Sequence, residues 1–139
     1  KGAERELYIR GKEIYSREGF CMTCHQADGT GLSASGFPTL SKTPWVLGNE
    51  QRLIKIVLKG LQGPIEVNGQ KFSGHVPMTP FEGMLKDDEV AAVLTYVRNS
   101  FGNKASAITP DQVKAVRDAV KDKKRFYTST EILSEHPMQ

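Results

Sequence analysis

Apolar residues recur at helical spacing in three stretches of this chain, which predicts three helices that each bury one face. Gly19 is expected to end the first helix. The second is expected to begin after Asn49 as N-cap and to stop at Gly60. Asp87 opens the third, which is expected to run until Gly102. The apolar positions are Leu7, Gly11, Ile14 and Tyr15 in the first, Leu53, Ile54, Val57 and Leu58 in the second, and Val90, Val93, Leu94, Val97 and Phe101 in the third.

Turn and capping signals define the rest of the chain. Asn68-Gly69 separates two short apolar runs and predicts a hairpin of residues 65–67 and 70–72. Thr109 followed by Pro110 predicts the start of a further helix, and Thr128 with Glu131 predicts a capping box for a last short one. Because helices dominate and the strands are few and short, the fold class is expected to be all-α.

The chain has two cysteines, three positions apart, in the segment Cys21-Met22-Thr23-Cys24-His25. The pattern C-x-x-C-H is the attachment signal for haem c. Two intervening residues allow both sulfurs to reach the two vinyl positions on one porphyrin edge, and the histidine that follows is carried under the ring, where it can ligate iron. The sequence therefore predicts one haem c, bound through Cys21 and Cys24 and ligated by His25.

Three other interpretations of the two cysteines fit the sequence less well. A thioredoxin-like redox pair needs a βαβ context, whereas the flanks of this motif look helical. A structural zinc site needs four ligands, and the chain has no second cysteine pair to complete one. A disulfide across two residues would be strained and would leave His25 unexplained.

The second axial ligand of the iron is expected to be Met78. Pro77 and Pro80 bracket it, so the loop can hold an extended backbone stiff against the haem face. With both axial positions filled, no substrate reaches the iron and the domain transfers single electrons. If Met78 does not ligate, the open position suits a peroxidase or a gas sensor. The other candidate ligands are Met22, Met84 (expected as core filler), Met138, His75 (expected to make a surface hydrogen bond) and His136.

Composition and charge limit the partners. The 139 residues include 19 basic and 16 acidic ones, a formal charge of +3, and no basic run interleaved with aromatics, so nucleic acid is not expected as a partner. No stretch reaches the roughly 20 apolar residues that span a membrane. The cluster Lys121–Arg125 reads as a solvated helix end or as a docking patch for an acidic partner. Because the chain begins with Lys1, it is expected to be a mature product or part of a longer protein.

Several separated motifs, in this order, resemble the class I cytochrome c domains of bacteria, in particular those associated with quinoprotein dehydrogenases and respiratory complexes. The resemblance runs from about residue 4 to 103. The segments that carry it are Gly11–Tyr15, Cys21–His25, Phe37–Leu40, Gly63–Gly69, Met78–Phe81 and Val93–Asn103. It departs from many relatives at Thr79, where they have a second proline.

The resemblance implies a cytochrome c fold of about four to five helices around one covalent haem. It implies that the carbonyl of Pro38 accepts a hydrogen bond from His25 and that Gly11 meets Tyr96 where two helices cross. Residues 1–108 would form the domain, and residues 109–139 a helical extension packed on or flanking it. Haem-pocket residues carried over by the resemblance are Leu40, Leu94 and Val97.

Two further residues are candidate partners of the haem propionates. Trp45 can donate its indole N–H, and Arg52 can offer a guanidinium fork. The expected macromolecular partners are redox proteins, namely a dehydrogenase, an oxidase or another cytochrome, and the expected location is periplasmic or otherwise extracytoplasmic. An alternative role is that of a docking module within a larger dehydrogenase, reached through residues 109–139.

Overall fold

The computed structural model describes residues 2–17 and 20–138, and helices dominate it. The all-α prediction is confirmed. Helices α2 and α3 were not predicted, because their five and four residues are too few to show a helical period. In chain order the elements are α1 (Gly2–Tyr15), α2 (Cys21–His25), a 3-10 turn η1 (Ser33–Ser35), α3 (Pro44–Leu47), α4 (Glu50–Lys59), β1 (Leu61–Gln62), β2 (Ile65–Val67), β3 (Gln70–Phe72), α5 (Asp87–Arg98), α6 (Pro110–Ala119), β4 (Tyr127–Thr128) and α7 (Ser129–Glu135).

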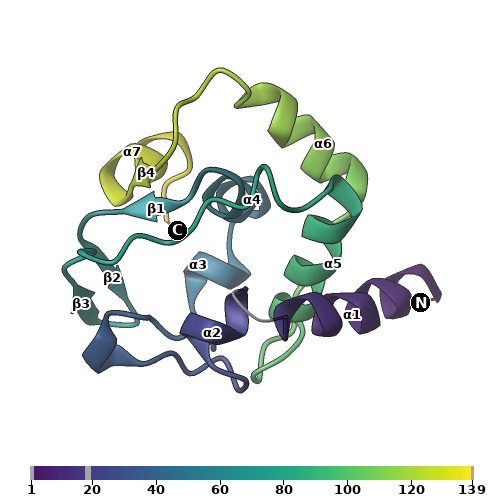
Figure 1. The fold of residues 1–139 in the computed structure, drawn as a ribbon, viewed down its shortest axis with the longest axis horizontal. Helices are drawn as coiled ribbons and strands as arrows, with labels where there is room; N and C mark the ends of the chain where they lie inside the picture. The colour runs from purple at the N-terminus through teal and green to yellow at the C-terminus, as the bar shows by residue number, and fades with distance from the viewer. Residues whose placement is uncertain (1, 18–19, 139) are drawn as a thin grey trace.

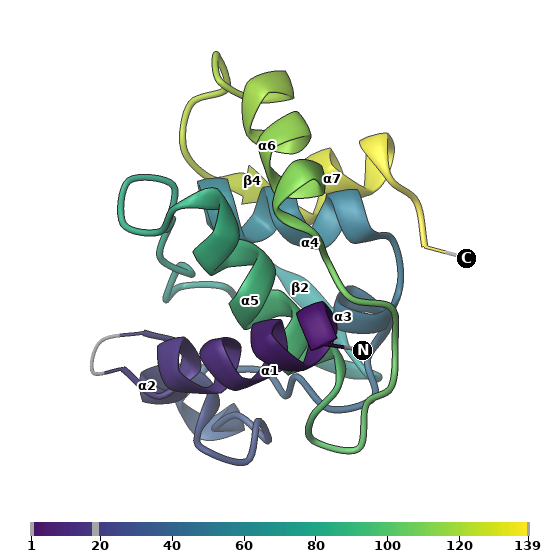
Figure 2. The same cartoon turned by 90° about the vertical axis from the view of Figure 1, so that its right-hand side faces the viewer.

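Helices α1 and α5 cross closely, and both views of the ribbon show one lying over the other (Figures 1 and 2). Gly11 lies at the crossing. A Cβ there would overlap the carbonyl of Ala92 and stand 2.7 Å from the Cβ of Tyr96. The predicted meeting of Gly11 with Tyr96 is therefore confirmed, and the glycine is needed because nothing larger fits between the two backbones.

Local capping sets the ends of α4 as predicted. The side chain of Asn49 accepts a hydrogen bond from the backbone N–H of Arg52, and Gly60 follows the last turn with φ of 82°. The predicted break at Gly19 lies outside the described residues.

Helix α5 ends at Arg98, short of the predicted end at Phe101. Phe101 adopts φ of 60°, and its ring packs 5.4 Å from that of Tyr15 and 5.7 Å from that of Tyr96. Phe101 therefore continues the helical spacing of apolar residues although the helix has already ended, because its ring packs against those of Tyr15 and Tyr96.

The predicted hairpin is present. Strands β2 and β3 pair antiparallel with Ile65 opposite Phe72, and Asn68 and Gly69 both adopt positive φ in the turn. That conformation matches the two-residue turn for which Asn-Gly is the strongest signal. The hairpin places Ile65 and Phe72 side by side on one of its faces.

Residues 109–138 pack onto the rest of the chain and form the upper part of the molecule in both views (Figures 1 and 2). Thr109 is the N-cap of α6 as predicted, and it also forms a capping box with Gln112 that was not predicted; the predicted capping box of Thr128 with Glu131 is present. Helix α6 packs against α4 and α5, and β4 pairs in parallel with β1. Val113, Val116 and Val120 belong to the same buried cluster as residues of α1, α4 and α5. In the part of the chain that the structure describes, no helix has the length and apolar character needed to cross a membrane.

Candidate functional site

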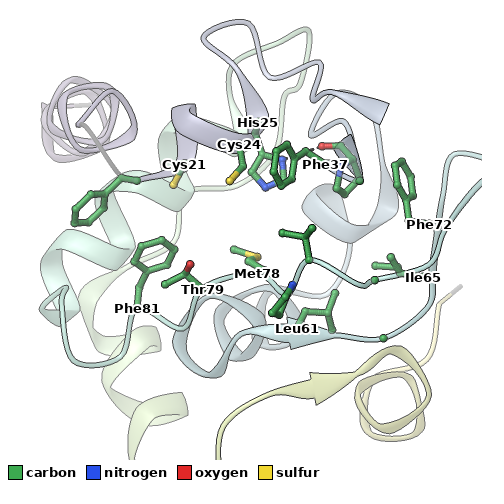
Figure 3. Close-up of a pocket in the computed structure, with 17 residues that line it drawn as sticks. Cys21, Cys24, His25, Phe37, Leu61, Ile65, Phe72, Met78, Thr79 and Phe81 are labelled. Atoms are coloured by element: carbon green, nitrogen blue, oxygen red, sulfur yellow. Dashed lines mark hydrogen bonds between the residues drawn. The ribbon is translucent and has the colours of Figure 1, made fainter. Parts of the chain in front are cut away.

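A hollow lies between α2 on one side and the loop after β3 on the other (Figure 3), and a second hollow adjoins it on the inner side. They contain about 800 and 670 Å³ of atom-free space, mouths included. We treat them as two chambers of one cavity, because they share the residues Cys21, His25, Pro38, Leu61, Ile65 and Met78.

His25 ends α2 and is buried at the cavity wall, with 9% of its surface exposed. Its Nδ1 lies 2.8 Å from the carbonyl oxygen of Pro38. A carbonyl can only accept, so Nδ1 carries the proton and Nε2 keeps its lone pair. Burial lowers the pKa of His25, although the Pro38 carbonyl acts in the opposite direction. The hydrogen bond expected between these two residues is present, and it leaves a neutral imidazole with one nitrogen free to ligate.

The two cysteines are separated by one turn of α2, which places both on the cavity side of the helix. Figure 3 shows the two sulfurs on the same wall as the His25 ring. Neither forms a disulfide, and before attachment of a haem, burial raises the pKa of the Cys21 thiol to about 12 and also raises the pKa of the Cys24 thiol. Among the described residues, no group of three or more His, Cys, Asp or Glu side chains could hold a metal ion. The arrangement fits two thioether bonds to one haem edge and gives a zinc site no support.

Met78 lies on the wall opposite His25 (Figure 3). Its backbone N–H donates to the carbonyl of Leu61 at 2.8 Å. A Cβ on Gly60 would lie 2.6 Å from the carbonyl oxygen of Met78, so this close approach of the two segments needs the glycine. Three residues later, the N–H of Phe81 donates to Val57 in α4 at 2.9 Å. The methionine loop is thus held on β1 and on α4 by backbone hydrogen bonds from Met78 itself and from Phe81.

Among the described residues that line the two chambers, His25 and Met78 are present and none of the other candidate ligands is. Met84 is 53% exposed, so the expectation that it fills the core was wrong; it lies in the turn before α5. His75 is exposed, and its Nδ1 lies 2.6 Å from Ser73 Oγ, which is the surface hydrogen bond expected for it. Met138 is 36% exposed, and His136 lies beside Arg52 in the C-terminal segment.

The cavity lining is apolar, and among the described residues it contains no Lys, Arg, Asp or Glu. Leu40, Leu94 and Val97 line the inner chamber, in the positions the resemblance implied. A second group of lining residues was not predicted from the sequence. The only signal for them was an aromatic or apolar side chain in a loop, or the alternation of apolar residues in the hairpin. The residues of this second group are Phe20, Phe37, Leu61, Ile65, Phe72 and Phe81.

Of the two candidate propionate partners, Trp45 lines the cavity and Arg52 does not. Trp45 lines the inner chamber, but its indole N–H donates to the carbonyl of Glu66 at 2.9 Å. Arg52 lines neither chamber, and its guanidinium donates to the carbonyls of Pro44, His136 and Pro137. We therefore correct the expectation for Arg52. Its guanidinium N–H groups, which were expected to bind a propionate, donate to backbone carbonyls instead, two of them in the C-terminal segment.

Comparisons with known proteins agree with this geometry. The family model described as Cytochrome c matches residues 8–101. Cytochrome c-552 of Thermus thermophilus is 35% identical over 115 residues, which cover 77% of this chain and 83% of that protein. The fructose dehydrogenase cytochrome subunit of Gluconobacter japonicus is 30% identical over 108 residues, 77% of this chain but only 22% of the subunit. The cbb3-type cytochrome c oxidase subunit FixP of Bradyrhizobium diazoefficiens is 29% identical over 94 residues, 67% of this chain and 30% of that protein. The chain belongs to the cytochrome c family: it binds haem c covalently and is an electron-transfer domain rather than a catalytic one.

Proposed function

We propose that this domain carries single electrons on one low-spin haem c that has His25 and Met78 as its axial ligands. Cys21 and Cys24 form the thioethers in this proposal. The observation that carries it is the placement of the His25 ring and the Met78 side chain on opposite walls of one apolar cavity (Figure 3). When bound, the haem supplies an iron that alternates between ferric and ferrous states, and a methionine ligand favours the ferrous state relative to a second histidine.

The remaining wall residues keep the site closed and dry. The carbonyl of Pro38 holds the proton on Nδ1 of His25, which fixes the tautomer and the orientation of the ring. Leu40, Leu94 and Val97 exclude water from the inner chamber. A peroxidase needs an acid–base or cationic group beside the open face of the iron. The described lining offers no charged side chain for that role, so the structure gives no support to the peroxidase alternative.

The electron donors and acceptors are proposed to be redox proteins. Relatives of this chain include cytochrome subunits of dehydrogenases and of an oxidase, which supports a partner of that class. We propose a dehydrogenase, an oxidase or another cytochrome as partner and an extracytoplasmic location, because haem c is attached outside the cytoplasm. The docking-module alternative gains nothing from the structure, since the apolar faces of α6 and α7 are already buried on this chain's own core.

Binding of carbon monoxide by the ferrous protein tests the ligand assignment. We expect the native protein not to bind the gas, because Met78 occupies the sixth position, and we expect Met78→Ala to bind it stoichiometrically. Met84→Ala is the matched control: this methionine is 53% exposed, and its variant should behave as the native protein. Stoichiometric binding by the native protein would remove the proposal and restore the gas-sensor alternative.

A further inference from the structure

Arg52 is a buried cation whose N–H groups, within the part of the chain that the structure describes, donate only to neutral carbonyls. It lies in α4 and is 2% exposed. Its Nη1 donates to the carbonyl of His136 at 2.9 Å and to that of Pro137 at 3.3 Å, and its Nη2 donates to Pro44 at 2.9 Å. Its Nε is buried without a hydrogen-bond partner among the described residues.

The absence of an acidic partner distinguishes Arg52 from the other buried cations. Arg98 has Glu50 at 3.7 Å, and Lys59 has Glu82 at 2.7 Å. Arg52 forms no ion pair with any residue that the structure describes. Burial lowers the pKa of its guanidinium, but such a group stays charged throughout the range in which proteins fold. Among the described residues no acidic group neutralises its charge, and burial leaves the charge little screened by solvent.

One aromatic ring separates this charge from the haem cavity. The guanidinium carbon of Arg52 lies 5.5 Å from the ring centroid of Trp45, whose ring lines the inner chamber. The indole N–H is fixed to Glu66 in the hairpin, so Trp45 cannot swing away without losing that bond. The carbonyls of residues 136 and 137 close the other side of the guanidinium.

We propose that Arg52 tunes the reduction potential of the haem: residues 136–137 hold its charge, which has no acidic partner among the described residues, behind Trp45, and this charge favours the ferrous state. Reduction adds one electron to the iron centre, so a fixed positive charge nearby makes reduction more favourable. The proposal rests on the covalent haem but not on the identity of the sixth ligand. It gives residues 136–137 a role in the redox site although they do not line the cavity.

Redox titration of two kinds of Arg52 variant separates charge from packing. Arg52→Gln removes the charge, and Arg52→Met does so with a side chain of similar length. We expect each to lower the equilibrium constant for reduction about tenfold, which for one electron is a fall of about 59 mV in midpoint potential. Arg52→Lys keeps the charge and should stay within about twofold of the native constant, even if the protein is less stable. The control Arg125→Gln makes the same change at an exposed position and should leave the constant unchanged.

Two results would overturn the proposal. One is an unchanged potential in a neutral variant whose oxidised spectrum shows native ligation. The other is an equal fall in Arg52→Lys, which would assign the effect to packing. If neither neutral variant retains haem, Arg52→Lys decides alone: a potential within the twofold limit supports the proposal, and a larger fall refutes it. A native protein without haem bands would instead refute the assignment of the cofactor.

Discussion

Backbone carbonyls hold both His25 and Met78: His25 donates to Pro38, and the N–H of Met78 donates to Leu61. No sequence motif by itself indicates these contacts. The C-x-x-C-H spacing identifies His25 directly, and the paired prolines single out Met78 from several candidates. The contact of Arg52 with the end of the chain could not be predicted, because a side chain's partner 84 residues away depends on the whole fold. Met84 was misassigned for a related reason: an apolar residue in a turn carries no period that reports its burial.

Because the phenol of Tyr127 is buried, we expect the protein to lose stability at alkaline pH. Tyr127 is 1% exposed, and burial, with smaller contributions from Glu135 and Glu131, raises its pKa to about 12. In the unfolded chain the phenol ionises near pH 10, so the folded state binds more protons between these two values, and stability falls as pH rises. We expect a fall of about 1.4 kcal/mol per pH unit from this group across that window.

Urea unfolding of the native protein and of Tyr127→Phe, measured between pH 8 and 12, checks this expectation. The difference in unfolding free energy between the two proteins should be constant below about pH 10 and should then change in favour of the variant. A difference that stays constant through the whole range would show that Tyr127 does not hold its proton in the folded state.

Elements with local signals were predicted well. Asn49 and Gly60 delimit α4, and Asn68-Gly69 forms the hairpin turn. The N-cap Thr109 begins α6, and the capping box of Thr128 begins α7. The end of α5 was missed because Phe101 continues the helical spacing while its backbone turns to positive φ. Capping side chains act over three or four residues and can be read from sequence, whereas ring packing between separate elements cannot.

The crossing of α1 over α5 predicts that Gly11→Ala destabilises the protein. Alanine is the better helix former by about 1 kcal/mol, so the substitution would be stabilising in an isolated helix. Here the added Cβ overlaps the carbonyl of Ala92 and forces the helices apart, and we expect a net loss of about 1–3 kcal/mol in urea unfolding. Gly2→Ala in the same helix is the control, because nothing lies within 4 Å of its Cβ position. A Gly11→Ala protein as stable as the native one would mean that the crossing is looser than described.

Residues 109–138 share one core with the haem domain. Val113, Val116 and Val120 pack in the same cluster as Ile14, Ile54 and the buried residues of α5, and β4 completes a parallel pair with β1. The resemblance reached only to about residue 103, so it could imply an extension but not where the extension packs. We propose that the haem domain, residues 1–108, and the extension, residues 109–139, fold as one cooperative unit.

Val113→Ala tests this cooperativity. Val113 is 0% exposed, and removal of its two methyl groups should cost about 1–3 kcal/mol. Because the core is shared, haem absorption and far-ultraviolet circular dichroism should report one coincident transition, shifted equally to lower urea. Ile9→Ala, at a position 58% exposed, should leave the transition close to that of the native protein. Separate transitions for the two probes would instead assign the extension to an independent unit.

The absorption spectrum of the oxidised protein, native and Met78→Ala, tests the central claim most directly. A methionine bound to ferric haem gives a weak far-red band, so the account predicts that band in the native protein, its loss in Met78→Ala, and its retention in Met84→Ala. A high-spin native spectrum, or a far-red band that survives in Met78→Ala, would contradict a haem closed between His25 and Met78.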